Sequence, residues 1–98
     1  MNYKEKVKLI NYLISKYNHQ KSEDNYRFMC FDSDLVIMID HVFDRLDVDY
    51  QRIIKNDFIE KTSKYWWNEY YSRTTYYRLK NKAMSQFINC LHNRKMIL

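Results

Sequence analysis

Apolar side chains recur at steps of three and four residues along most of this chain, which is the period of an amphipathic α-helix. The pattern predicts a first helix over residues 2–17 and a polar break over residues 18–24. The apolar side of this helix carries Tyr3, Val7, Ile10, Leu13, Ile14 and Tyr17. Its lysines are spread around the helix, and we expect them to be solvated.

A second helix is predicted to begin at a cap formed by Asp32, Ser33 or Asp34 and to end at Leu46. It is apolar nearly all round at its start, so we expect it to be the central and most buried helix. Its β-branched residues also suit a short strand, but the chain offers no turn residues for a partner strand. The aromatic segment before it, residues 25–31, is either a short helix or an extended segment over the core.

A third helix is predicted from a cap at Asp47 or Asp49 to Phe58. Its inner face carries Tyr50, Ile53, Ile54 and Phe58. Residues 59–62 then form a connection, and Thr62 or Ser63 is expected to cap a short fourth helix over residues 64–69. One of its two tryptophans, Trp66 or Trp67, should anchor this helix in the core.

The last helix follows Ser72, whose hydroxyl can accept a hydrogen bond from a backbone N–H two or three residues later. Its apolar face carries Tyr76, Leu79, Ala83, Phe87, Cys90 and Leu91. Its opposite face carries Thr74, Tyr77, Arg78, Asn81 and Lys82. That face presents hydrogen-bond donors, cations and one aromatic ring without a carboxylate. It suits a negatively charged surface that must also be recognised in detail.

The run Ser-Arg-Thr-Thr-Tyr-Tyr-Arg-Leu-Lys-Asn-Lys-Ala at residues 72–83 resembles the recognition helix of the last DNA-binding domain of bacterial sigma factors. It is still more similar to the ArpU-type late-transcription regulators of Firmicute phages. It also resembles the C-terminal motif of a small uncharacterised mollicute family. The similarity is close over residues 72–83 and loose over residues 46–91. It implies a helix-turn-helix that binds duplex DNA, and RNA polymerase as a further partner.

On this resemblance, the DNA-binding residues are Ser72, Arg73, Thr74, Thr75, Tyr77, Arg78, Asn81 and Lys82. The start of the helix should hold a phosphate through its N–H groups and its dipole, flanked by Arg73 and Thr75. Arg78 suits a guanine edge and Asn81 an adenine edge. Lys82 should return to the phosphate backbone.

The turn before this helix departs from the family pattern. A common helix-turn-helix has a glycine between its helices, whereas Tyr70 and Tyr71 stand at this turn. The supporting helix also looks one or two residues short. If the usual geometry is kept, Asn68 or Tyr70 must accept a positive φ, which is costly for a tyrosine.

The composition favours a single all-α domain. The chain has 98 residues, no Gly and no Pro, which favours helices joined by short Asn, Asp and Ser turns. We predict a small bundle of four to six helices, with N-terminal helices and support over residues 1–46 and the helix-turn-helix region over residues 47–92. No apolar run is long enough to span a membrane, and residues 1–8 are too charged to open a secretory signal. We therefore expect a cytoplasmic protein that does not enter membranes.

The net charge of +5 is unevenly distributed. Five lysines face one glutamate over residues 1–21, whereas residues 22–60 carry ten acidic and four basic residues. Residues 61–98 carry eight basic residues against Glu69. A basic C-terminal segment is typical of proteins that bind the phosphate backbone. An ordinary solvated basic face has the same composition, so charge alone does not decide.

Catalytic chemistry is hard to place on this sequence. Cys30 and Cys90 are far apart, the three histidines are scattered, and no metal-ligand spacing is visible, so no metal or cofactor is expected. Each cysteine is interpreted as a small buried apolar residue. Asp40 and His41 are neighbours whose side chains point about 100° apart on a helix, and we interpret them as a solvated Asp and a boundary His. We predict that the protein is not an enzyme.

The sequence therefore predicts a DNA-binding transcription regulator or sigma-like factor. The alternative is an RNA-polymerase-associated or other protein-interaction module without sequence-specific DNA binding. RNA binding also stays open, because Tyr71, Tyr76 and Tyr77 could stack on unpaired bases. A long amphipathic last helix can pair with its own copy, so a homodimer is a further arrangement to consider.

Overall fold

Four α-helices and no strand make up the part of the chain described by this computed structural model, residues 1–23 and 33–97. They are α1 (Tyr3–Glu23), α2 (Ser33–Arg45), α3 (Val48–Ile54) and α4 (Arg73–Ile97). The predicted all-α fold is confirmed. The segment 25–31, with Cys30, lies outside the described residues.

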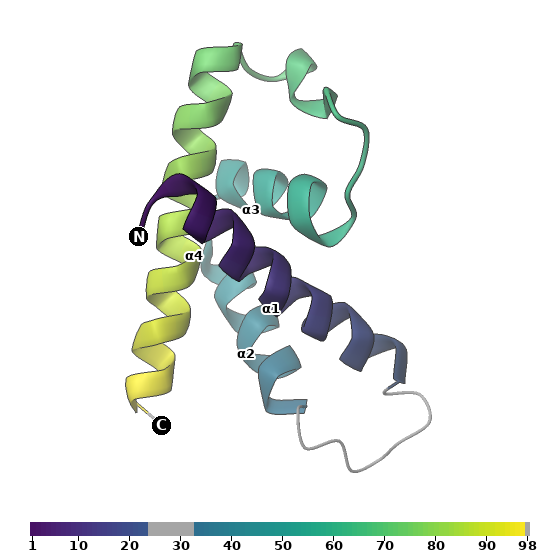
Figure 1. Cartoon of the computed structure of the whole chain (residues 1–98), viewed down its shortest axis with the longest axis vertical. Coiled ribbons are helices and arrows are strands. Elements are labelled where there is room, and N and C mark those ends of the chain that lie inside the picture. Colours follow the sequence, from purple (N-terminus) through teal and green to yellow (C-terminus); the bar gives the residue numbers. More distant parts are fainter. Residues whose placement is uncertain (24–32, 98) are drawn as a thin grey trace.

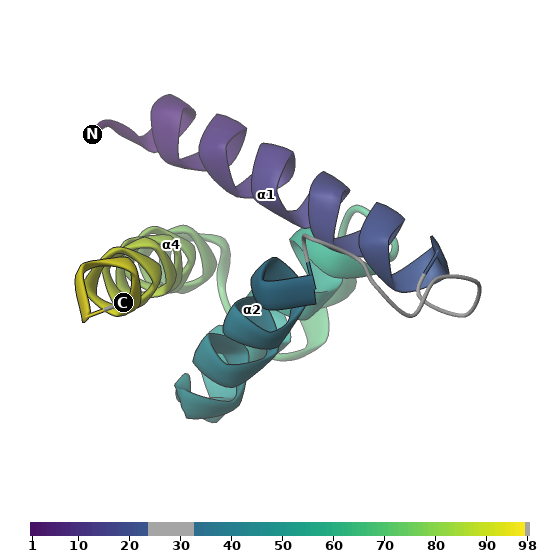
Figure 2. The same cartoon turned by 90° about the horizontal axis from the view of Figure 1, so that it is seen from below.

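The helix that organises the bundle is α4, which packs against α1, α2 and α3 (Figure 1). Figure 2 views α4 close to its own axis, with α1 and α2 running across the view, so neither helix is parallel to α4. The prediction that the second helix is central was wrong. With 25 residues against 13, α4 is long enough to reach all three partners, whereas α2 leaves Ile37 exposed on its outer side.

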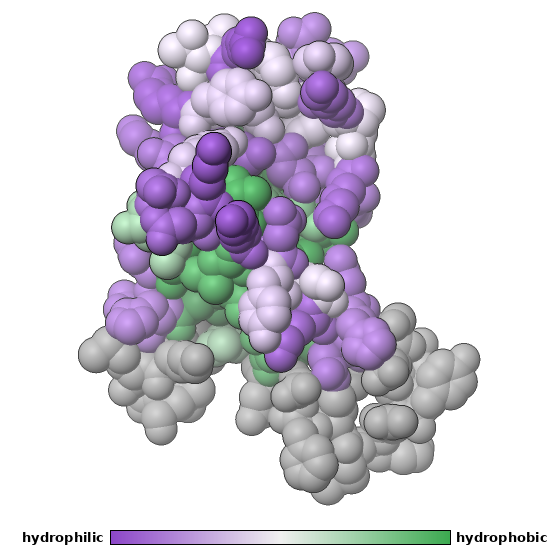
Figure 3. Space-filling view, viewed as in Figure 1, coloured by the Kyte–Doolittle hydropathy of each residue, from purple (hydrophilic) through white to green (hydrophobic). Residues whose placement is uncertain are grey.

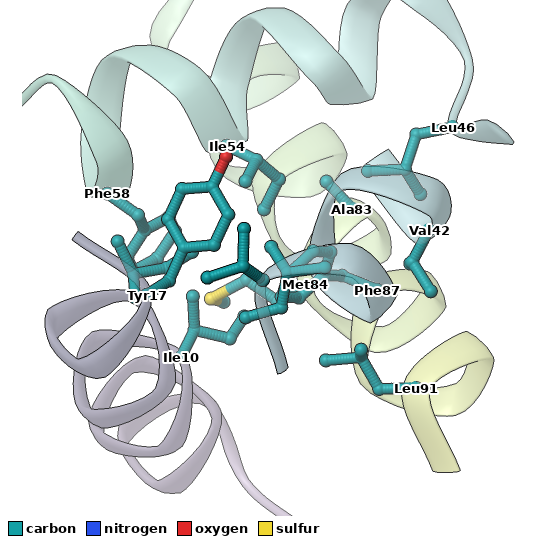
Figure 4. Packing of buried hydrophobic residues seen from close by; sticks show 13 residues of the cluster. Ile10, Tyr17, Val42, Leu46, Ile54, Phe58, Ala83, Met84, Phe87 and Leu91 are labelled. Carbon is teal, nitrogen blue, oxygen red and sulfur yellow. The ribbon is translucent and has the colours of Figure 1, made fainter. Parts of the chain in front are cut away.

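The main core lies where these helices meet (Figure 4). Its fully buried side chains include Ile10 and Ile14 of α1, Ile39 and Val42 of α2, and Phe87 of α4. Burying one such side chain stabilises the fold by about 1.5–3 kcal/mol. The predicted inner faces of the first and last helices are therefore confirmed, except that Tyr3 at the start of α1 is exposed. Cys90 is partly buried and packs against this core.

The first helix is longer than its pattern predicted. Asn2 and Glu5 exchange hydrogen bonds between their side chains and backbone N–H groups, at 2.8 and 3.1 Å, which is a capping box. The predicted break at residues 18–24 was wrong, because α1 runs on to Glu23. No Gly or Pro stops the helix there, and Lys21 Nζ donates to the Tyr17 hydroxyl at 3.1 Å, one turn back.

The third helix ends in an unusual turn. α3 continues directly into a π-helical turn over Lys55–Ile59, in which the Glu60 N–H donates to the Lys55 carbonyl at 2.8 Å. The predicted extent, to Phe58, is thus nearly right. The wider turn lets Phe58 enter the main core while its neighbour Asp57 faces α4. Lys61, with φ of 50°, then redirects the chain.

The predicted fourth helix is reduced to a single 3₁₀ turn, η2 (Trp66–Glu69). Trp67 is the tryptophan that anchors it, in a second small core formed by Ile53, Trp67 and Tyr76. The expected positive φ at Asn68 or Tyr70 was wrong: Tyr70 has φ of −109°, and Lys61 is the residue with positive φ in the described part of the chain. The turn closes instead through the Tyr70 and Tyr71 N–H groups, which both donate to the Trp67 carbonyl at 2.9 Å.

Candidate nucleic-acid interface

Ser72 caps α4 as its position predicted. The Thr75 backbone N–H donates to Ser72 Oγ at 3.2 Å, and the Ser72 hydroxyl donates to Thr75 Oγ1 at 3.0 Å. The two hydroxyl groups are therefore used in shaping the first turn. The other N–H groups of this turn stay available at the helix start.

The face of α4 opposite the core is exposed. Arg73, Thr74, Tyr77, Arg78 and Lys82 all have exposed side chains, and Ala83 and Phe87 on the other side are fully buried. The predicted orientation of the helix is confirmed. In the part of the chain that the structure describes, no carboxylate pairs with Arg73, Arg78 or Lys82. These three cations therefore keep their charge available for a partner.

Asn81 is exposed, yet its side chain has a partner that the sequence did not suggest. Lys6 Nζ of α1 donates to Asn81 Oδ1 at 3.0 Å, across 75 positions of sequence. The start of α1 passes over the middle of α4 at this point (Figure 1). The expectation that the lysines of the first helix are merely solvated was wrong for Lys6, which is half-buried.

A shallow groove of about 690 Å³ results from this contact. Its walls are Asn2, Tyr3 and Lys6 from the start of α1 and Tyr77, Arg78, Asn81 and Lys82 from α4. Four of the predicted site residues thus share a surface with a lysine from the other end of the chain. In the space-filling view, hydrophilic and weakly hydrophilic residues cover the upper part of the molecule, and hydrophobic residues show lower down (Figure 3).

Asp57 holds the surrounding elements in place. Its carboxylate accepts hydrogen bonds from the Trp66 indole N–H at 2.7 Å and from the Tyr76 hydroxyl, and it pairs with Lys80 Nζ at 3.2 Å. Burial, and then this hydrogen bond, raise the pKa of Tyr76 far above its ordinary value of 10.0. Lys80 is thereby turned away from solvent. Asp57 follows the buried Ile53 by four residues, a spacing that places it on the inner face and could have revealed it.

A second set of contacts fixes the turn before α4. The Tyr71 hydroxyl donates to Asp49 Oδ1 at 2.7 Å and accepts from the Arg52 guanidinium at 3.0 Å. The same guanidinium lies 4.5 Å from the ring centre of Tyr70. Burial, followed by the hydrogen bond to Asp49, raises the pKa of Tyr71. α3 therefore carries the turn that sets the direction of α4.

These contacts bear on the tyrosines considered for stacking on unpaired bases. Tyr76 is buried and stacks on Trp67, with ring centres 4.7 Å apart. Tyr71 is held by Asp49 and Arg52. Of these three tyrosines, Tyr77 is exposed and so has a ring available for stacking.

His41 is partly buried, and its Nε2 has no hydrogen-bond partner in the described part of the chain. Asp40, interpreted above as solvated, instead accepts a hydrogen bond from the Tyr17 hydroxyl. No group of His, Cys, Asp and Glu residues suited to a metal ion occurs among the described residues. None of the described helices is both long enough and apolar enough to cross a membrane.

Comparison with protein-family models, with curated proteins and with solved structures gives no significant match for this chain. The resemblance to sigma factors and ArpU-type regulators therefore stays a prediction, carried by residues 72–83.

Proposed function

We propose that this protein binds duplex DNA through the first half of α4 and acts as a transcription regulator. The observation that carries the proposal is a set of exposed cations on α4, with Arg73 at its start and Arg78 and Lys82 on its outer face. None of them pairs with a carboxylate in the part of the chain that the structure describes. A duplex carries closely spaced phosphates that such a face can neutralise. Residues 70–98 include no Asp or Glu, so no acidic side chain in this segment repels the phosphates.

The start of α4 supports a phosphate contact. Its free N–H groups and the positive end of its dipole favour an anion, and Arg73 lies at the same end. Ser72 and Thr75 contribute by shaping this turn, because their hydroxyls already bond to each other. We assign these residues to positioning the duplex.

Base recognition falls to Thr74, Tyr77 and Arg78, which are exposed on the same face. A guanidinium can donate two hydrogen bonds to one guanine edge, which is worth about 1–3 kcal/mol of discrimination. Asn81 was expected to contact adenine, but its amide oxygen is engaged by Lys6. We propose instead that Asn81 holds Lys6 beside Lys82, where both contact the phosphate backbone.

The test is a binding titration on duplexes selected from a random pool, carried out at two salt concentrations. Arg78→Ala should relax the preferred sequence at one position, and Lys82→Ala should weaken all duplexes alike and lower the salt slope by about one unit. Arg45→Ala is the matched control, since Arg45 is an exposed arginine on α2. If Arg78→Ala and Lys82→Ala both bind like Arg45→Ala, this face does not bind DNA.

A protein-interaction module, with RNA polymerase among its partners, is the second candidate. Two large apolar side chains outside α4, Ile37 and Val48, are 61% and 69% exposed. They belong to α2 and α3, in the acidic middle of the chain. Loss of polymerase capture in Ile37→Ser and Val48→Ser variants, with unchanged DNA titrations in the α4 variants, would favour this candidate.

A further inference from the structure

A second groove lies beside the proposed DNA-binding face, and four of its wall residues, Lys64, Tyr65, Trp67 and Asn68, have no part in the proposed duplex contact. It has a volume of about 580 Å³ and is formed between η2 and the start of α4. Its walls are Lys64, Tyr65, Trp67, Asn68, Arg73 and Tyr77. Arg73 and Tyr77 stand at the border between the two surfaces, so a ligand on one can continue onto the other.

Aromatic rings line this groove and are held in place. Tyr65 and Tyr77 are 63% and 44% exposed. The Tyr65 ring meets Trp67 edge to face at 6.2 Å, and Tyr77 meets Tyr76 at 4.9 Å. Trp67 is itself stacked on Tyr76. Because both exposed rings rest on buried ones, they offer flat apolar surfaces whose orientation is set before a ligand arrives.

Cations accompany the rings. Lys64 Nζ lies 5.6 Å from the ring centre of Tyr65, and Lys64 has no carboxylate partner in the described part of the chain. Arg73 lies at the other side of the groove. A neighbouring groove of about 380 Å³ shares Lys64 and Tyr65 and leads on to Lys61. The combined surface therefore runs from Lys61 to Arg73, with positive charge at both ends and aromatic rings between.

This arrangement is the one used to hold a single strand of nucleic acid, in which cations follow the phosphates and rings stack on successive bases. A base inside a duplex has both faces covered by its neighbours, so stacking on Tyr65 requires an unpaired base or the outer face of a terminal base pair. An apolar peptide is a poorer match, because most side chains around Tyr65 are cations, amides and hydroxyl-bearing residues. Trp67 and the Asp57 carboxylate also line these grooves, and the charge of Asp57 is paired with Lys80.

We infer that this groove binds unpaired nucleotides of a DNA strand, with a base stacked on Tyr65 and phosphates on Lys61 and Lys64, next to the duplex that Arg73 and Tyr77 contact. The inference rests on the proposed function in one respect. A duplex bound to α4 places the end of one of its strands at the groove. The protein then prefers DNA in which a duplex adjoins a single-stranded stretch.

The experiment compares a blunt duplex with the same duplex carrying an oligothymidine extension at one end, titrated with the full chain. The extension should strengthen binding by about fivefold or more, the effect of stacking one base. Tyr65→Leu should remove this gain and leave blunt-duplex binding unchanged. Tyr12→Leu is the matched control, because Tyr12 is also exposed and has Lys16 Nζ 5.0 Å from its ring centre, but belongs to α1. Circular dichroism should show both variants folded.

The inference is overturned by no gain from the extension, by a gain that survives in Tyr65→Leu, or by equal displacement of the extended duplex by polyglutamate and by oligothymidine. The last would show a surface that binds any polyanion. Stronger binding of an oligouridine than of an oligothymidine extension would make RNA the partner and overturn the assignment to DNA.

The two proposals fail separately. If the blunt duplex binds with Arg78 dependence but the extension adds nothing, only the groove assignment fails. If the blunt duplex does not bind while free oligothymidine binds in a Tyr65-dependent way, the groove assignment stands and the duplex proposal fails.

Discussion

The indole N–H of Trp66 donates a hydrogen bond to the carboxylate of Asp57 at 2.7 Å, joining the turn before α4 to the end of the third helix. Asp57 also accepts from the Tyr76 hydroxyl and pairs with Lys80, so one carboxylate holds η2 and α4 together. The two charged side chains of this pair are only 12% and 15% exposed. The position of the proposed DNA-binding helix therefore depends on a residue outside it.

Replacing Asp57 with Ala should lower the free energy of unfolding by about 3–5 kcal/mol, because it leaves Lys80 as an unpaired, largely buried charge and removes the acceptor of two hydrogen bonds. Urea denaturation of the two proteins measures this difference. Asp44→Ala, at an exposed position of α2, should change stability by less than about 0.5 kcal/mol. Equal stability of the two variants would show that Asp57 does not hold this region.

Stability should decrease at alkaline pH. The pKa values of Tyr17, Tyr71 and Tyr76 are raised in the folded protein, in each case first by burial. The unfolded chain therefore loses these protons first, and the stability they contribute is complete below about pH 10 and falls as the pH rises above it. Denaturation over a pH series should show less of this loss in Tyr76→Phe than in Tyr12→Phe. An identical decline in both variants would contradict the role of Tyr76.

Lys6 should contribute to DNA affinity although it lies in the first helix. If Asn81 holds it beside Lys82, then Lys6→Ala should weaken binding to all duplexes and lower the salt slope by about one unit. Asn81→Ala should cause part of the same loss without changing the preferred sequence. Lys8→Ala, an exposed lysine one half-turn away, is the control. A change of sequence preference in Asn81→Ala would instead support direct contact with a base.

A charged substitution in α2 should prevent folding on the buried side of the helix and be tolerated on the exposed side. Val42→Asp should prevent folding, because an unpaired charge in the core costs several kcal/mol against a total stability of about 5–15 kcal/mol. Val42 is fully buried, whereas Ile37 on the same helix is exposed. Ile37→Asp should therefore fold with a helical circular dichroism spectrum. Loss of structure in both variants would mean that the outer side of α2 is also covered.

Local patterns in the sequence were enough to place most of the helices and their faces. Ser72 caps α4 through a residue three positions away, and Ala83 and Phe87 face inward because their spacing matches the helical period. Such features depend on interactions within one or two turns, which neighbouring residues determine. The length of α1 was misjudged because polar residues 18–23 continue the helix as readily as they end it when no Gly or Pro intervenes.

Only the tertiary structure decided which elements meet. The bond between Lys6 and Asn81 joins residues 75 positions apart, and the three partners of Asp57 come from η2 and α4. Such contacts depend on the angles and offsets at which helices cross, and helical period carries no information about these. For the same reason the sequence identified the exposed face of α4, whereas the groove beside Tyr65 and the wall contributed by α1 appear only once the helices are packed.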